Sequence, residues 1–194
     1  MSVVTKVVSG LVTAVLLAAA MWLYGSKPRL EAGMQNPITN HGRIGAVAGN
    51  RVFSVKVGRA DVASAVAKRD ILRNATAMPT SGIFVIVYLE IRSNQKPFQP
   101  GHVRLATRGG LSYDESGRPA IYTSHGDYQP MLWGQASYVF EIPKDRLAGA
   151  RLIVGESAPM NQLSAEADID LGIDNGRAAR LLAHPPGDYI LKTT

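Results

Sequence analysis

The feature that most constrains this fold is an apolar run near the middle of the chain, GIFVIVYLEI over residues 82–91. β-Branched and aromatic residues dominate the run, and this composition favours a strand over a helix. Apolar side chains occupy both alternating sets of positions, so a strand here has two apolar faces and both need cover. The run therefore predicts a central strand in a layered β structure.

Further segments with strand character follow at short intervals, and turn residues separate them. In residues 51–57 apolar and polar side chains alternate, as they do in a strand with one buried face. Gly109 and Gly110 separate two such segments in the manner of a hairpin turn. The other segments are residues 60–67, 103–107, 111–113, 136–142, 150–154 and 165–171. About seven to nine short strands, with one short helix predicted over 177–183, indicate an all-β fold, either an antiparallel sandwich or a barrel.

The composition limits the chemistry as well as the fold. The chain has 194 residues, of which 46% are apolar. This length allows one domain or at most two, and the apolar fraction is too high for a disordered chain. There is no cysteine, which excludes disulfide bonds, thiol nucleophiles and thiolate-ligated metals. An exported domain of this composition would depend on its apolar core alone.

The N-terminal residues 1–24 contain a stretch of 18 uncharged residues that ends at Tyr24. As a helix this stretch would extend about 27 Å, close to the thickness of a membrane's hydrocarbon core. Lys6 and the small residues 18–20 also fit a cleavable signal peptide. Trp22 and Tyr24 continue the apolar run beyond that point and are typical of membrane-interface anchors. We therefore expect a transmembrane signal-anchor over residues 1–24, with cleavage as the alternative.

Small residues recur on one face of this expected helix. Gly10, Ala14 and Ala18 are four positions apart, which would let a second membrane helix approach closely. Such residues are also common in membrane helices by chance, so both interpretations stay open. If the face packs, it predicts a membrane-protein partner bound through the transmembrane helix. The short N-terminal flank favours an N-terminus inside the cell and an exported body.

Residues 25–42 separate the expected anchor from the strands. They contain Pro28, Pro37 and several glycines and asparagines, without an apolar period. Such a composition indicates a flexible linker. We assign the remaining residues, 43–194, to one extracytoplasmic β-sandwich domain.

Three stretches of the chain resemble a known family. They read GIFVIVYLEIRSNQKPF, RLATRGGLSYDES and WGQASYVFEIPKDRLAGARLIVG, and together they cover roughly residues 50–171. Their order is similar to that of bacterial extracytoplasmic immunoglobulin-like (telokin-like) domains, typified by the secreted immunoprotective antigen of mycobacteria and its membrane-anchored relatives. The resemblance implies an immunoglobulin-like antiparallel β-sandwich outside the cytoplasm, and it supplies no catalytic residues.

Ser157 is the strongest candidate for a catalytic nucleophile. It follows a predicted strand in a Gly-Glu-Ser-Ala stretch, as the nucleophile of an α/β-hydrolase does. The fifth position of that motif is Pro159 instead of glycine. His184 is only 27 residues further on, which leaves too little chain for the crossovers of that fold. We expect a loop serine and no enzymatic activity.

The acids Glu166, Asp168 and Asp170 alternate with apolar residues near the C-terminus. This alternation places the three carboxylates on one face of a strand. An EF-hand loop is excluded, because Gly172 and Ala179 stand where calcium ligands belong. A solvated strand face is the first interpretation and weak calcium binding is the second. The histidines lack the spacing of a zinc site, so we predict no metal site and no cofactor.

Aromatic residues gather between the predicted hairpin and the strand at 136–142. Tyr122, Tyr128 and Trp133 are candidates for an interaction loop, because loops at the ends of a sandwich often carry recognition. Aromatic side chains are also enriched at the centres of protein interfaces. Ordinary core packing would account for part of the group, including Tyr138.

The charge balance and the motifs together lead to a functional expectation. The net charge is +6, with 21 basic and 15 acidic residues. Aromatic residues are not interleaved with the arginines, so we expect no nucleic-acid partner. The anchor and the single sandwich predict a non-enzymatic accessory or scaffolding subunit of a larger cell-envelope complex, such as a transporter. The alternative is a free-standing extracytoplasmic module that binds a ligand, a cation or an envelope polymer.

Overall fold

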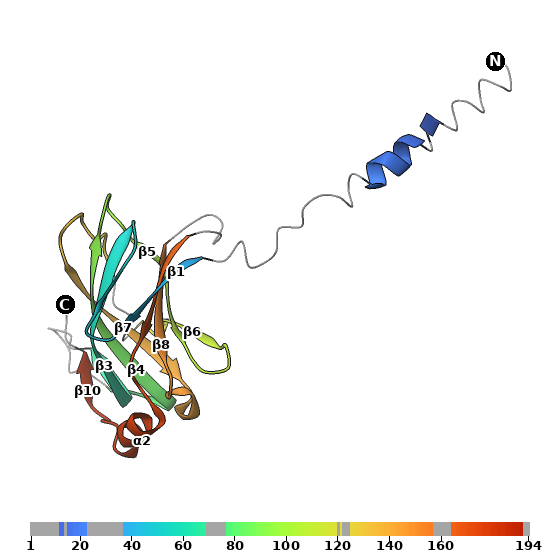
Figure 1. Cartoon of the computed structure of the whole chain (residues 1–194). Coiled ribbons are helices and arrows are strands. Elements are labelled where there is room, and N and C mark those ends of the chain that lie inside the picture. Colours follow the sequence, from blue (N-terminus) through green and yellow to red (C-terminus); the bar gives the residue numbers. More distant parts are fainter. Residues whose placement is uncertain are drawn as a thin grey trace, which may run out of the picture. The chain divides into compact units, whose positions relative to one another are not determined.

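The computed structural model describes residues 12–13, 15–22, 37–68, 77–119, 121, 125–156 and 164–191. The chain divides into two compact units, Met1–Gln35 and Asn36–Thr194. The described residues of the first unit are helical. No helix in the described part of the chain combines the length and the apolar character that crossing a membrane requires. All of the strands lie in the second unit (Figure 1).

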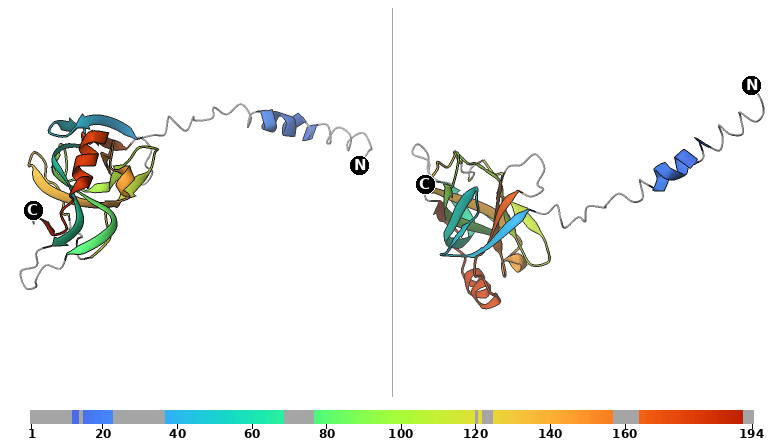
Figure 2. Two further views of the ribbon diagram at one scale, coloured as in Figure 1. Left: turned by 90° about the horizontal axis from the view of Figure 1, so that it is seen from below. Right: turned by 45° about the horizontal axis from the view of Figure 1, so that its top comes forward.

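The second unit folds as two sheets packed face to face (Figure 2). Sheet A has the strand order β1-β9-β8-β5-β6, and sheet B has the order β10-β3-β4-β7, with β2 paired to β3. The strands of sheet A are β1 Ile38–Arg43, β5 Pro100–Ala106, β6 Ser112–Asp114, β8 Arg151–Glu156 and β9 Ala165–Asp170. The strands of sheet B are β2 Val47–Gly49, β3 Phe53–Lys68, β4 Met78–Ser93, β7 Gly134–Ile142 and β10 Tyr189–Leu191. The predicted all-β sandwich is confirmed.

The central apolar run forms much of β4 and is buried on both faces. On the inner face, alternate residues from Ile83 to Ile91 pack in the main core with Phe140 of β7 and with Leu152 and Ile169 of sheet A. On the outer face a second cluster forms around Phe84, Ile86, Val66, Val139, Ile121 and Leu191. Ile121 lies between β6 and β7 in the sequence, and Leu191 belongs to the last strand. The outer face of β4 is therefore covered by segments distant in sequence.

The first and the last strand of the domain are both edge strands, and each runs parallel to its neighbour. β1 pairs with β9, and β10 pairs with β3, so the sandwich is not purely antiparallel as predicted. Parallel partners need long connections, and these two strands meet that need because each lies far in sequence from its partner. The predicted boundary between linker and domain at residue 43 is wrong, because residues 38–42 belong to β1.

The predicted helix is confirmed as α2, Asn175–Ala183, and a short 3₁₀ helix, η2, spans Lys144–Arg146. α2 begins earlier than the predicted residue 177 because Asp174 caps it. The Asp174 carboxylate accepts a hydrogen bond from the Arg177 backbone N–H at 2.6 Å, which satisfies one of the free donors of the first turn.

Substitution of Ile121 tests how much the cover on the outer face of β4 contributes to stability. Its side chain is 1% exposed, and Ile121→Ser should lower the free energy of unfolding by about 2–4 kcal/mol, because it removes buried apolar atoms and leaves a polar group in their place. Urea denaturation followed by circular dichroism measures the change. The matched control is Leu111→Ser, in a turn where the side chain is 47% exposed, with an expected change within about 0.5 kcal/mol. Equal losses in the two variants would contradict this account.

Candidate functional site

The residues singled out from sequence fall into distinct groups. Five of them lie outside the described residues: Gly10, Ala14, Tyr24, Tyr122 and Ser157. Ala18 and Trp22 lie exposed in the helix of the first unit. Tyr128 is buried in the sandwich, whereas Trp133 is exposed. The three acids of β9 lie together on the outer face of sheet A, as their alternation predicts.

Glu166 is the centre of the first polar group on that face. In the strand register it lies between Thr39 of β1 and Gly155 of β8, and Gly155 pairs in turn with His102 of β5. Because Gly155 has no side chain, the imidazole of His102 extends across β8, and its Nε2 lies 3.5 Å from Glu166 Oε2. On the other side, Thr39 Oγ1 donates a hydrogen bond to Glu166 Oε1 at 3.0 Å.

These contacts keep Glu166 ionised. The hydrogen bond from His102 lowers the pKa of the Glu166 carboxyl below its ordinary value, and this effect exceeds the opposing effect of burial. The hydrogen bond from Thr39 and the positive charge of Arg104 lower the pKa further. Glu166 is therefore a charged acceptor shared by two neighbouring strands.

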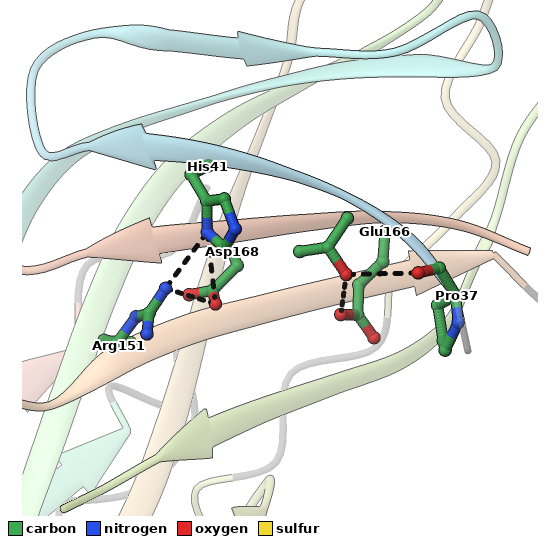
Figure 3. A network of polar contacts seen from close by, with 6 residues as sticks. Pro37, His41, Arg151, Glu166 and Asp168 are labelled. Carbon is green, nitrogen blue, oxygen red and sulfur yellow. Dashed lines mark hydrogen bonds and ion pairs between the residues drawn. The ribbon is translucent and has the colours of Figure 1, made fainter. Parts of the chain in front are cut away.

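Asp168 is the centre of the second polar group (Figure 3). Its carboxylate binds the guanidinium of Arg151 and lies 3.6 Å from His41 Nδ1. Arg151 Nη2 also lies 3.1 Å from the same nitrogen of His41. The side chain of Asp168 is only 11% exposed, so the interpretation as a solvated strand face is wrong for Asp168 and Glu166.

The two groups act as a structural network. Glu166 and Asp168 contact different partners, His102 and Arg151, and Asp170 accepts a hydrogen bond from the Gly172 backbone N–H at 2.8 Å. In the described ranges, no three His, Asp or Glu side chains form a group that could hold a metal ion. Since Thr39 and His41 belong to β1, the network fixes this edge strand to sheet A.

A third polar group lies where the edge strands β6 and β7 of the two sheets approach one another. His125 stacks on Tyr138 with ring centroids 4.1 Å apart, and His125 Nε2 lies 3.5 Å from Glu115 Oε1. Burial raises the pKa of the Tyr128 hydroxyl, partly offset by its hydrogen bond with Tyr138. A pocket of about 360 Å³ beside this group is lined by residues 99–104, Asp114, Glu115, His125 and Tyr138.

The outer face of sheet B carries an open groove of about 310 Å³, which we call the sheet B groove. Its lining is Lys56, Gly58, Arg59, Tyr88, Leu89, Glu90, Gln135 and Ala136. The register places Lys56 opposite Glu90 and Glu90 opposite Gln135, so these three side chains form one row across β3, β4 and β7. Arg59 and Tyr88 face each other in the next row, beyond an irregularity at Gly58.

Arg59 is held in place at the groove. Its guanidinium lies 4.5 Å from the centre of the Tyr88 ring, and its Nε lies 3.0 Å from Asp61 Oδ2. Tyr189 of β10 donates a hydrogen bond to the same Asp61 oxygen and lies 3.2 Å from the Tyr88 hydroxyl. Burial raises the pKa of Tyr189, so its hydroxyl stays a donor.

Lys56 adds a second positive charge to the groove. Within the described ranges it forms no ion pair with a carboxylate, and it shares the groove with a guanidinium already fixed by its neighbours. The one signal of this surface in the sequence is the set of polar residues opposite the apolar face of 51–57. We did not single out Lys56 or Arg59 from it, because the irregularity at Gly58 interrupts the alternation.

Comparison with known proteins adds a likeness in fold. No family model and no curated protein matches this sequence. An uncharacterised β-sandwich protein from Clostridium difficile is 12% identical, with 74% of this chain and 99% of that chain covered and a TM-score of 0.44. The YjhA protein from Bacillus subtilis is 10% identical, with 66% and 99% covered and a TM-score of 0.46. The secreted protein MPT63 from Mycobacterium tuberculosis is 16% identical, with 69% and 97% covered and a TM-score of 0.47.

MPT63 is a secreted mycobacterial protein of the kind that typifies the family resembled by the sequence. The β-sandwich fold that the resemblance implies is confirmed by the two sheets of the structure itself. Sequence identities this low do not support the transfer of an activity, a ligand or a partner from these proteins to this chain.

Gly155 tests the network on sheet A. A Cβ at this position would lie 2.0 Å from the His102 ring, so Gly155→Ala should displace the imidazole and lower the free energy of unfolding by about 1–3 kcal/mol. The pKa of Glu166 should rise in the variant, because His102 is the main cause of its lowering. Denaturation and an NMR titration of the carboxyl measure the two effects. The control is Gly126→Ala, because a Cβ at that position would meet nothing within 4 Å. Unchanged stability and an unchanged Glu166 titration in Gly155→Ala would refute the proposed network.

Proposed function

We propose that this chain is a non-enzymatic accessory or scaffolding subunit of a larger cell-envelope complex, such as a transporter. Residues 1–24 form its single-pass signal-anchor, with Trp22 and Tyr24 at the membrane interface, and the sandwich lies on the extracytoplasmic side. A membrane-protein partner packs on the helix face made by Gly10, Ala14 and Ala18. Neither a cofactor nor a nucleic acid takes part.

The sheet B groove is the observation that carries this proposal. Arg59 is already ordered by Tyr88 and Asp61, so it loses little conformational freedom when a partner binds. Lys56 adds a cation without an ion pair among the described residues. The lining therefore has two cations, Lys56 and Arg59, against one acid, Glu90. An excess of positive charge is complementary to an acidic protein surface, and such complementarity supplies specificity and fast association. We assign the groove to an acidic face of the partner subunit.

The alternative function rests on a different place in the fold. The pocket between the edge strands brings Arg104, Asp114 and Glu115 together with His102 and His125. Hydrogen-bond donors and acceptors of both charges in one concave site suit a small polar ligand or the end of an envelope polymer. A free-standing binding module would use this pocket and would leave the sheet B groove without a partner.

Photo-crosslinking in the native cell distinguishes the two functions. A photoreactive phenylalanine analogue in place of Gln135, which lies in the groove, should yield one discrete cross-linked product. The double variant Lys56→Glu, Arg59→Glu should reduce that product by more than about tenfold, because two attractive charges become repulsive. The matched control carries the same analogue in place of Leu111, an exposed side chain away from the groove.

Two results would contradict the proposal. One is the absence of any product at position 135, and the other is the same product at positions 135 and 111. Loss of envelope function on changing His102 or His125, with normal cross-linking at position 135, would show that the pocket has a role of its own.

A further inference from the structure

Three loops are joined by hydrogen bonds at one end of the sandwich, and we call this region the loop end. It comprises residues 49–53, 92–98 and 129–133. Asn94 joins the first two loops, since its backbone N–H donates to Val52 O at 2.8 Å and its side-chain amide donates to Asn50 O at 2.7 Å. The Met131 backbone N–H donates to Ser93 O at 3.0 Å and so joins the third loop to the second. Phe53 and Phe98 stack beneath the loops with ring centroids 4.5 Å apart.

The tip of the third loop exposes three consecutive large apolar side chains. Met131 is 69% exposed, Leu132 is 66% exposed and Trp133 is 40% exposed. Met131 has a φ of 64°, a conformation that is unfavourable for a residue with a long side chain. The hydrogen bond to Ser93 holds it there. The apolar tip is therefore a preformed feature of the loop end.

Most of the charged side chains around this tip are positive. Arg51 and Lys96 are exposed, and the guanidinium of Arg92 lies 4.8 Å from the centre of the Trp133 ring. The three loops contain no Asp or Glu. The nearest acids along the chain, Glu90 and Asp127, lie outside them, and Asp127 lines a pocket together with Leu132 and Trp133. An apolar tip that includes tryptophan and is surrounded by cations matches the surface of an anionic bilayer, where tryptophan prefers the interface and cations meet lipid phosphates.

The strand register places the start of the sandwich at this same end. Ile38 pairs with Ala165, and Pro100 pairs with Glu156, so β1 begins at the end of sheet A where the loop 94–99 enters β5. Residues 25–37 number 13, and a chain of that length spans at most about 45 Å. A body tethered at residue 24 therefore stays close to the membrane, and its first strand begins at the end that carries the apolar tip.

We propose that the loop end is a membrane-docking surface: Met131, Leu132 and Trp133 insert into the interface of an anionic bilayer, while Arg51, Lys96 and Arg92 contact lipid phosphates. This rests on the tether of the proposed function and does not involve the sheet B groove. Docking here would hold the sandwich in one orientation on the bilayer. The tether raises the local concentration of the loop end at the membrane, so a weak surface suffices.

Site-specific fluorescence in reconstituted vesicles tests the docking. The chain has no cysteine, so Leu132→Cys and the control Leu111→Cys each take one environment-sensitive NBD label. Leu111 lies beyond the opposite end of β5. The full-length chain is reconstituted into vesicles with brominated acyl chains, made of phosphatidylcholine with or without phosphatidylglycerol. Docking predicts a blue shift and quenching of the label at 132 in anionic vesicles, and neither effect at 111.

Variants separate the contribution of charge from that of the apolar tip. In anionic vesicles the ratio of docked to undocked chain should fall about fivefold for each cation removed in Arg51→Gln and Lys96→Gln. Both residues are exposed, so these changes leave the sandwich intact, and circular dichroism verifies this. Met131→Ser should reduce quenching at 132 in neutral and anionic vesicles alike.

The following results would refute the proposed docking surface. If the chain inserts into the bilayer but the label at 132 is not quenched, the proposed tether stands and the proposed docking surface is refuted. Equal quenching at 132 and 111 shows non-specific contact. A label at 132 that is shielded in native membranes but not in lipid vesicles assigns the loop end to a protein partner. A chain that binds neither the neutral nor the anionic vesicles contradicts both the tether and the docking surface. The cross-linking at position 135 tests the sheet B groove and does not depend on either result.

Discussion

The burial of β4 on both of its faces is the constraint on which the rest of the structure depends. Its inner face packs with sheet A around Phe140, Leu152 and Ile169, and this contact makes the sandwich. Its outer face would expose Phe84 and Ile86 if nothing covered it. Ile121 and the C-terminal strand provide that cover. The last strand also brings Tyr189 to Asp61, so one covering element closes the second apolar cluster and orders the sheet B groove.

The sequence predicts the parts of this fold that depend on local pattern. The alternation in 51–57 and the acids of β9 give the correct element and the correct face, and the glycine pair gives the correct hairpin. The edge strands β1 and β10 are different, because three to six residues paired with a distant strand leave no period to detect. The contact of His102 with Glu166 depends on a missing side chain in the strand between them, and the groove depends on an irregularity at Gly58. The contact has no local signal, and the groove has only the polar residues opposite the apolar face of 51–57.

The outer surfaces of the sandwich differ in what they can do. The acids of sheet A are engaged by His41, His102 and Arg151, and this face serves to hold β1 in place. The sheet B groove keeps positive charge available to a partner, and the loop end exposes apolar side chains among cations. A body with these surfaces suits a tethered subunit that is oriented on a membrane by one end and bound to a partner by one sheet.

Labelling in intact cells tests most directly whether the sandwich is an exported body that remains attached to the membrane. The Leu111→Cys chain carries a single thiol, in an exposed turn, and a membrane-impermeant maleimide reaches it only outside the cytoplasmic membrane. For an exported and anchored sandwich we expect equal labelling before and after lysis, on a full-length chain that stays in the membrane fraction after an alkaline wash. Labelling that appears only after lysis, or a labelled chain that has been shortened and released, would contradict it.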